Sequence, residues 1–194
     1  MADNTPTDAN PAKSETPIAD PVTVVPMGAD FTIRATTEDD KPWIRRLLRR
    51  YWATENILSK GQIHNAVDAT GLAAFQNDEP VGLITYNIAE SPDNPGQHEC
   101  EILTHNSMAD SGGIGSCLLA AVRNEARAHN CRRLWLVTTN DNTPAIRFYQ
   151  RRDFDICALH KDAISKARDL KPEIPDEGLD GIRVRHEIEL EYVL

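Results

Sequence analysis

The glycine-rich segment Asp110-Ser-Gly-Gly-Ile-Gly-Ser116 has residue types and spacing that suggest ligand chemistry. After it, Ile114, Leu118 and Val122 recur at four-residue steps, so a helix should begin within the glycines. The first amides of a helix have no intrahelical acceptor and lie at the positive end of its dipole. Glycines let a phosphate approach such amides closely, whereas a simple tight turn is the alternative. We predict a pyrophosphate cradle formed by Ser111, Gly112, Gly113, Ile114, Gly115 and Ser116.

Two other phosphate-binding motifs do not fit this segment. A P-loop has a Lys and then a Ser or Thr after its last glycine, but Ser116-Cys117 follows here. A dinucleotide fingerprint has a third glycine three residues beyond Gly115, where Leu118 stands. The cradle therefore belongs to neither class.

The sequence after the cradle carries a second motif. Residues 132–139 are a candidate strand, and Asn142-Thr-Pro-Ala-Ile-Arg-Phe-Tyr149 begins a helix that leads to Phe154. The order of cradle, helix, strand, Asn-x-x-Ala-x-x-Phe-Tyr and Phe resembles the GNAT superfamily of acyl-CoA-dependent N-acetyltransferases. The resemblance covers roughly residues 31 to 160.

The resemblance implies an α/β fold, with a mixed, mostly antiparallel sheet of six or seven strands and helices on both faces. It implies direct transfer of an acetyl group from acetyl-CoA to a primary amine. The backbone of residues 103–105 would align the pantetheine arm like an added strand. The expected cosubstrate-binding residues outside the cradle are Leu103, Thr104, His105, Asn142 and Ala145.

Tyr149 occupies the position that the resemblance assigns to the general acid, which protonates the departing thiolate of coenzyme A. A phenol with a pKa near 10 and a thiol with a pKa of about 8.5 make that transfer close to isoenergetic. Phe148 and Tyr149 are adjacent, so a helix directs them differently. We expect Phe148 in the core and Tyr149 at the edge of the cleft.

The sequence departs from the family pattern at two positions. The Arg or Gln that usually begins the cradle is Asp110, which removes a cationic contact to the pyrophosphate and adds a like charge. The Gly that usually precedes the last Phe of the motif is Asp153, and Asp tolerates left-handed backbone geometry.

Glu101 is the candidate base. In a strand over residues 98–105, a period of two places Glu99, Glu101, Leu103 and His105 on one face. Burial would raise the pKa of Glu101 and make it a better base for the attacking amine, directly or through water. The alternative is that Glu99 and Glu101 pair with arginines or lie at a solvated strand end. His105 is a second candidate base.

The acceptor is open at this stage. We favour a small-molecule primary amine over a peptide acceptor, and the rival class is a non-catalytic module that binds acyl-CoA. Trp52, Glu55, His64 and Asp68 lie in the region expected to form one wall of the acceptor site, but ordinary packing or solvation is favoured for each.

Composition limits the remaining classes. The chain has 194 residues and a net charge of −9, without a basic stripe, so nucleic acid is not an expected partner. Residues 1–30 hold five prolines, five acids and one lysine, which predicts a disordered acidic tail before a single domain over 31–194. Without an export signal or a long apolar run, we expect a cytoplasmic protein that does not bind membranes. We also expect reduced cysteines and no metal, and the sequence leaves a homodimer open.

The remaining elements follow from periodicity and turn residues. A helix is expected after Thr36 or Thr37, and a short one near 162–170. Residues 52–70 are interpreted as a loop with a short helix or strand. The last strand alternates acidic and apolar residues, which predicts one buried face. In all, the expected strands are residues 31–35, 72–76, 81–89, 98–105, 132–139, 154–160 and 187–192.

Overall fold

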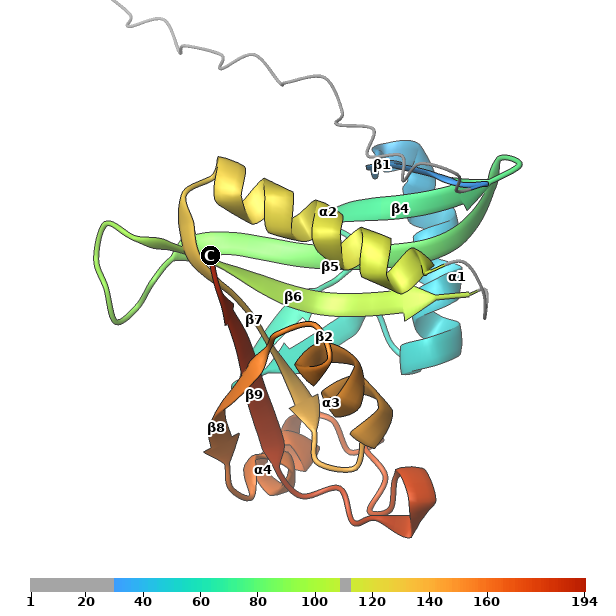
Figure 1. The fold of residues 1–194 in the computed structure, drawn as a ribbon. Helices are drawn as coiled ribbons and strands as arrows, with labels where there is room; N and C mark the ends of the chain where they lie inside the picture. The colour runs from blue at the N-terminus through green and yellow to red at the C-terminus, as the bar shows by residue number, and fades with distance from the viewer. Residues whose placement is uncertain (1–29, 109–112) are drawn as a thin grey trace, which may run out of the picture.

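The computed structural model describes residues 30–108 and 113–194, so the predicted tail and Asp110, Ser111 and Gly112 of the cradle lie outside the described residues. Seven strands form one sheet in the order β1-β4-β5-β6-β7-β9-β8, and β2 and β3 form a separate hairpin (Figure 1). The strands are β1 Thr32–Ala35, β2 Asn56–Ser59, β3 Gln62–Asn65, β4 Thr70–Gln76, β5 Glu79–Glu90, β6 His98–Ser107, β7 Cys131–Thr139, β8 Asp155–His160 and β9 Glu187–Val193.

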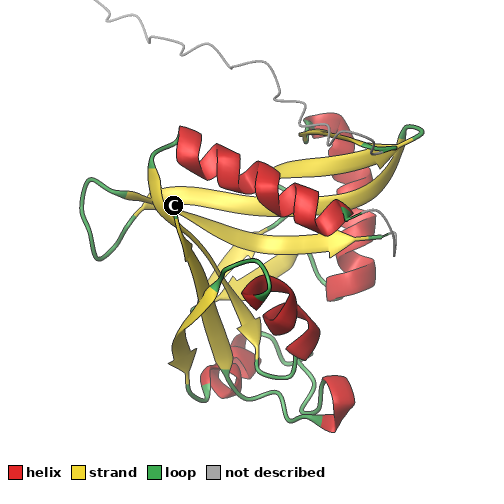
Figure 2. Ribbon diagram, in the orientation of Figure 1, coloured by secondary structure: helices red, strands yellow, loops and turns green. Residues whose placement is uncertain are grey.

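Strands β6 and β7 are paired in parallel, whereas the other neighbours in the sheet are antiparallel. Their pairing ends at Glu101 and Trp135, although β6 continues to Ser107 and β7 to Thr139. The two strands then diverge, and the sheet opens into a V (Figure 2). Among the described residues, this opening leaves the β7 side of β6 without a paired strand from Ile102 to Asn106.

Helices cover both faces of the sheet, as predicted. Helix α2 packs its apolar stripe against β4, β5, β6 and β7, whereas α1 covers the opposite face with Ile44, Leu47 and Leu48 (Figure 1). The α/β fold and the mostly antiparallel seven-stranded sheet are therefore confirmed. The helices are α1 Lys41–Trp52, α2 Ile114–Ala128, α3 Thr143–Gln150 and α4 Ala163–Leu170, with short 3-10 turns at Glu38–Asp40 and Leu179–Gly181.

A β-bulge at Leu103 changes the faces of β6. Thr104 pairs with Thr85 and Ile102 with Tyr86, so Leu103 has no direct partner on β5. An extra residue reverses the alternation of the side chains that follow. The expectation that Glu101 and His105 share a face is therefore wrong, because His105 lies on the α2 face and Glu101 on the other.

The structure corrects two further sequence expectations. Residues 52–70 contain the β2–β3 hairpin, which turns at Lys60-Gly61, rather than a loop with one short element. On β9 the acidic face is buried as well as the apolar one, since Glu187 and Glu189 are only 5% and 4% exposed. Among the helices described, none is long and apolar enough to cross a membrane.

Candidate active site

A cavity of about 270 Å³ occupies the V between β6 and β7. Its walls come from the free part of β6, from the end of β7, and from α2 and α3. Most of the expected site residues meet here. The lining residues are Trp52, Ile102, Leu103, Thr104, His105, Ser107, Gly115, Leu136, Val137, Thr138, Asn142, Pro144, Ala145, Phe148 and Tyr149.

Helix α2 begins beside this cavity. Gly113 caps it with a left-handed φ of 72°, which glycine adopts without steric cost. The amide of Cys117 donates to the Gly113 carbonyl, so the amides of Ile114, Gly115 and Ser116 precede the first intrahelical bond. A Cβ on Gly115 would stand 3.5 Å from both His105 and Phe148. The described part of the cradle therefore has the geometry expected for an anion site.

Arg152 lies at the start of α2. Its Nε and Nη2 donate to Ser116 Oγ at 3.1 and 2.6 Å, and its guanidinium stacks 3.6 Å above the ring of Phe148. A shallow cavity beside it is lined by Thr143, Pro144, Arg147, Phe148, Arg151 and Arg152. The sequence analysis did not identify this cluster, because Arg152 reaches α2 from a segment 36 residues later in the chain.

Asn142 caps α3, as the local sequence predicts. Its Oδ1 accepts a hydrogen bond from the Ala145 amide at 3.2 Å, and Pro144 occupies the first turn of the helix. Asn142 also lines the cavity in the V. The capping role is shown, and a contact to the pantetheine arm stays a prediction.

Tyr149 and His105 form a hydrogen-bonded pair. His105 Nδ1 lies 2.9 Å from the Tyr149 hydroxyl, and Nε2 lies 3.0 Å from the Gly115 carbonyl. Burial lowers the pKa of His105 to about 4, so the ring is neutral at pH 7. A carbonyl can only accept, so Nε2 carries the proton and Nδ1 accepts from Tyr149. His105 therefore has no free lone pair with which to act as a base.

The burial of the two aromatic residues is the reverse of the expectation. Tyr149 is 5% exposed and packs against Phe154, whereas Phe148 is only partly buried at the cavity wall. A tyrosine can be buried here because His105 accepts its hydroxyl proton. Burial also raises the pKa of Tyr149 above its usual value, so proton transfer to a thiolate is less favourable than the sequence analysis expected.

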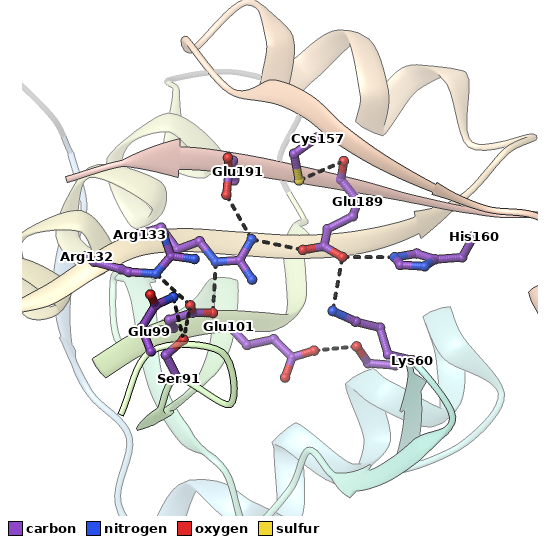
Figure 3. Close-up of polar contacts among 12 residues, drawn as sticks. Lys60, Ser91, Glu99, Glu101, Arg132, Arg133, Cys157, His160, Glu189 and Glu191 are labelled. Atoms are coloured by element: carbon purple, nitrogen blue, oxygen red, sulfur yellow. Dashed lines mark hydrogen bonds and ion pairs between the residues drawn. The ribbon is translucent and has the colours of Figure 1, made fainter. Parts of the chain in front are cut away.

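The two acids of β6 have different surroundings. Glu99 pairs with Arg132 and Arg133 at 2.8 Å each, in the charged cluster of Figure 3. Glu101 accepts a hydrogen bond from Ser59 and lies 3.9 Å from His64 Nε2. Burial raises the pKa of Glu101. The arginine pairing considered for both acids thus holds for Glu99, while Glu101 is not among the residues that line the cavity.

A second cavity of about 230 Å³ adjoins the first. The two share Trp52, Ile102, Leu103, Val137, Thr138 and Asn142, so they meet where the strands diverge. Trp52, for which packing or solvation was favoured, therefore lines both cavities. The residues of the second cavity that do not line the first are Ile57, Leu58, Ser59, Thr139, Ile164, Lys171, Ile174 and Glu187.

The fold, with a cavity where two parallel strands diverge, is that of an α/β acyltransferase domain. The sequence matches the family model described as acetyltransferase (GNAT) family over residues 34–154, more than half of the chain. The chain therefore belongs to the GNAT family and is an acyl-CoA-dependent acetyltransferase.

Individual relatives agree with this family. The uncharacterized protein YdhI of Bacillus subtilis (strain 168) is 39% identical over 72% of this chain and 83% of its own length. An IAA acetyltransferase from Bacillus cereus ATCC 14579 superposes with a TM-score of 0.63 at 22% identity, covering 84% of this chain and 99% of its own. Arabidopsis thaliana Naa50, solved with the bisubstrate analogue CoA-Ac-MVNAL, superposes with a TM-score of 0.60 at 18% identity, covering 85% and 99%.

Proposed function

We propose that this protein transfers the acetyl group of acetyl-CoA directly to a primary amine of a small molecule. The observation that carries the proposal is the pair of adjoining cavities in the V, one beside the start of α2 and one beneath the β2–β3 hairpin. Two reactants can meet there from opposite sides of the sheet. Holding them together supplies much of the rate through proximity.

The first cavity suits acetyl-CoA. The amides of Gly113, Ile114, Gly115 and Ser116 would hold the pyrophosphate at the positive end of α2. The free edge of β6 at residues 103–105 offers backbone groups to the amides of the pantetheine arm, in the manner of strand addition. Thr104, Asn142 and Ala145 line the same passage.

Arg152 would supply the positive charge that Asp110 does not. Its guanidinium already donates to Ser116 at the start of α2, within the predicted cradle. Arg147 and Arg151 line the adjoining cavity with it. Coenzyme A carries a third phosphate besides its pyrophosphate, and this arginine cluster suits such a dianion. The cluster thus compensates for the departure of Asp110 from the family pattern.

Tyr149 is the proposed acid, and it faces the cavity from α3. Its proton points to His105, so the hydroxyl must turn toward the leaving sulfur. Because burial raises the pKa of Tyr149, the phenol stabilises the developing thiolate first by a hydrogen bond. That Glu101 accepts a proton from the amine, directly or through water, stays a prediction.

Calorimetry and thiol release test the proposal together. Purified protein should bind acetyl-CoA and release free thiol when a primary amine is added. Gly115→Val should lose acetyl-CoA binding, because its branched carbons extend beyond a Cβ that already stands 3.5 Å from His105 and Phe148. Ala120→Val, which adds similar bulk at an exposed position of α2, is the matched control. Binding without thiol release from any amine would favour the non-catalytic module.

Faster turnover of peptides than of small amines would favour the peptide acceptor. The cytoplasmic location and a homodimer stay predictions.

A further inference from the structure

Three glutamates share one face of β9, and two of them are held by cations. Glu189 lies 3.0 Å from Arg133 and 3.2 Å from Lys60, and Glu191 lies 2.8 Å from Arg133 (Figure 3). Within residues 30–108 and 113–194, Glu187 has no cation within the 4.0 Å of an ion pair, and its carboxylate accepts from the Lys60 backbone amide. A buried carboxylate without a cation is costly unless it takes up a proton or a ligand supplies the cation.

Glu187 lies where an acceptor would bind. It is 5% exposed, it pairs with Thr139 at the diverging end of β7, and it lines the second cavity. The other lining residues of that cavity are mostly apolar and come from α1, β2, β6, β7, the N-cap of α3, α4 and the segment after α4. A volume of about 230 Å³ is below the roughly 300–1,000 Å³ of pockets for drug-sized ligands. The enclosed part of the acceptor is therefore small and apolar.

We propose that Glu187 binds the acceptor's ammonium group and takes its proton, and that the acceptor is a primary amine with an apolar body and no second positive charge. This inference rests on the proposed function, since it assigns the acceptor side of the same site. Glu187 replaces Glu101 as the carboxylate that contacts the amine, because Glu187 lines the second cavity and Glu101 does not.

The Glu187 carboxylate removes one proton from the ammonium, and the neutral nitrogen attacks the thioester carbonyl. The carbon–nitrogen bond forms, the carbon–sulfur bond breaks, and its electron pair leaves with sulfur. A second proton from nitrogen ends on the thiolate, by way of Tyr149 or water, so the products are the amide and coenzyme A. The proton on Glu187 returns to solvent.

The charges around Glu187 define the acceptor class. Lys171 is a further charged residue of the second cavity. On its other side Glu187 lines a separate cavity with Lys60, Lys161 and Lys166. A second ammonium would meet lysines and no further carboxylate among the lining residues of either cavity. A second negative charge, by contrast, would be tolerated.

The groups that act on Glu187 come from three neighbouring elements. Burial raises the pKa of Glu187, and Glu101 on β6 acts in the same direction. His160 on β8 and Lys60 in the β2–β3 turn act in the opposite direction. The net increase makes Glu187 a stronger base than an exposed glutamate.

Three amines of one chain length test whether the site rejects a second positive charge on the acceptor: hexylamine, 1,6-diaminohexane and 6-aminohexanoate. With saturating acetyl-CoA, kcat/KM measured from thiol release should be at least about tenfold lower for the diamine than for hexylamine. This corresponds to a difference of about 1.4 kcal/mol in activation free energy. The value for 6-aminohexanoate should equal or exceed that of hexylamine. A diamine turned over as well as hexylamine would overturn the assigned acceptor class, as would faster turnover of the peptide MVNAL.

Glu187→Gln tests the residue. We expect kcat/KM for hexylamine to fall by about 10²-fold or more, with the acidic limb of its pH profile lost. Calorimetric affinity for acetyl-CoA should be unchanged, which also reports a folded protein. Glu191→Gln makes the same substitution on the same face of β9, beside Arg133, and should keep the wild-type profile. If the glutamine variant fails to fold, Glu187→Asp should retain the acidic limb with a higher KM for hexylamine.

Failure of this inference differs from failure of the proposed function. Wild-type turnover that Glu187→Gln leaves unchanged would overturn only the role of Glu187. A wild-type protein that turns over no amine would overturn the proposed function. In that case hexylamine binding to the coenzyme A complex, measured by calorimetry, still decides the inference. Binding that Glu187→Gln abolishes supports it, and binding that survives the substitution overturns it.

Discussion

Tyr149→Phe separates a structural role of the hydroxyl from a chemical one. The substitution keeps the ring that packs against Phe154 at a centroid distance of 5.2 Å and removes only the hydroxyl. His105 Nδ1 then loses its donor at 2.9 Å, while Nε2 continues to donate to the Gly115 carbonyl. The tautomer is therefore held, and Nδ1 is left as an acceptor without a partner.

Two magnitudes follow from this geometry. An unsatisfied buried acceptor costs about 1–3 kcal/mol of unfolding free energy. Loss of a positioned general acid lowers kcat by about 10²–10⁴-fold. Acetyl-CoA affinity should change little, because the substitution leaves the amides at the start of α2 in place.

The assay combines urea denaturation, calorimetry with acetyl-CoA, and thiol release with hexylamine. Tyr192→Phe is the matched control, since the Tyr192 hydroxyl accepts a 3.5 Å bond from Arg127, outside the lining of the cavity. Burial raises the pKa of Tyr149, so ionisation of this residue should lower kcat only above pH 10 in the pH profile. A Tyr149→Phe protein that is destabilised but turns over at the wild-type rate would refute the acid role and leave only the structural one.

Other predictions concern the cosubstrate and stability. Arg152→Leu should weaken acetyl-CoA binding by about tenfold or more, with a smaller salt dependence, measured by calorimetry. The pKa of His105 is about 4 in the folded protein, below the value of 6.5 for an unfolded chain. As the pH falls, the unfolded chain therefore binds a proton first, and the folded protein loses stability between pH 6.5 and pH 4. Urea denaturation of His105→Asn should lack that loss, which is on the order of 3 kcal/mol. Asp40→Asn should lower the free energy of unfolding by about 2 kcal/mol at pH 7, because it breaks the ion pair with Arg34 at 2.7 Å. The ion pair lowers the pKa of Asp40, so this stabilisation is present above the pKa of the unfolded chain and is lost in acid.

Local patterns in the sequence were sufficient for much of the fold. The four-residue apolar steps after Ile114 placed α2, and Asn142 followed by Pro144 placed the start of α3. Both signals depend on neighbours within one or two turns, so no distant contact is needed to interpret them. The order of these motifs was specific enough to predict the family and a sheet of six or seven strands, of which the structure has seven.

Only the tertiary structure decided which side chains meet in the site. The bulge at Leu103 depends on pairing with β5, and it moves His105 to the face opposite Glu101. The burial of Tyr149 depends on that same histidine, which lies 44 residues earlier in the chain.

The acidic face of β9 was equally hidden from sequence. Alternation shows that Glu187 and Glu189 share a face, but not that this face packs against cations and a cavity. Residue identity and spacing determine which elements form. Contacts between residues far apart in the chain decide which elements lie across from them. Those contacts therefore also decide which charges are neutralised and which remain for a ligand.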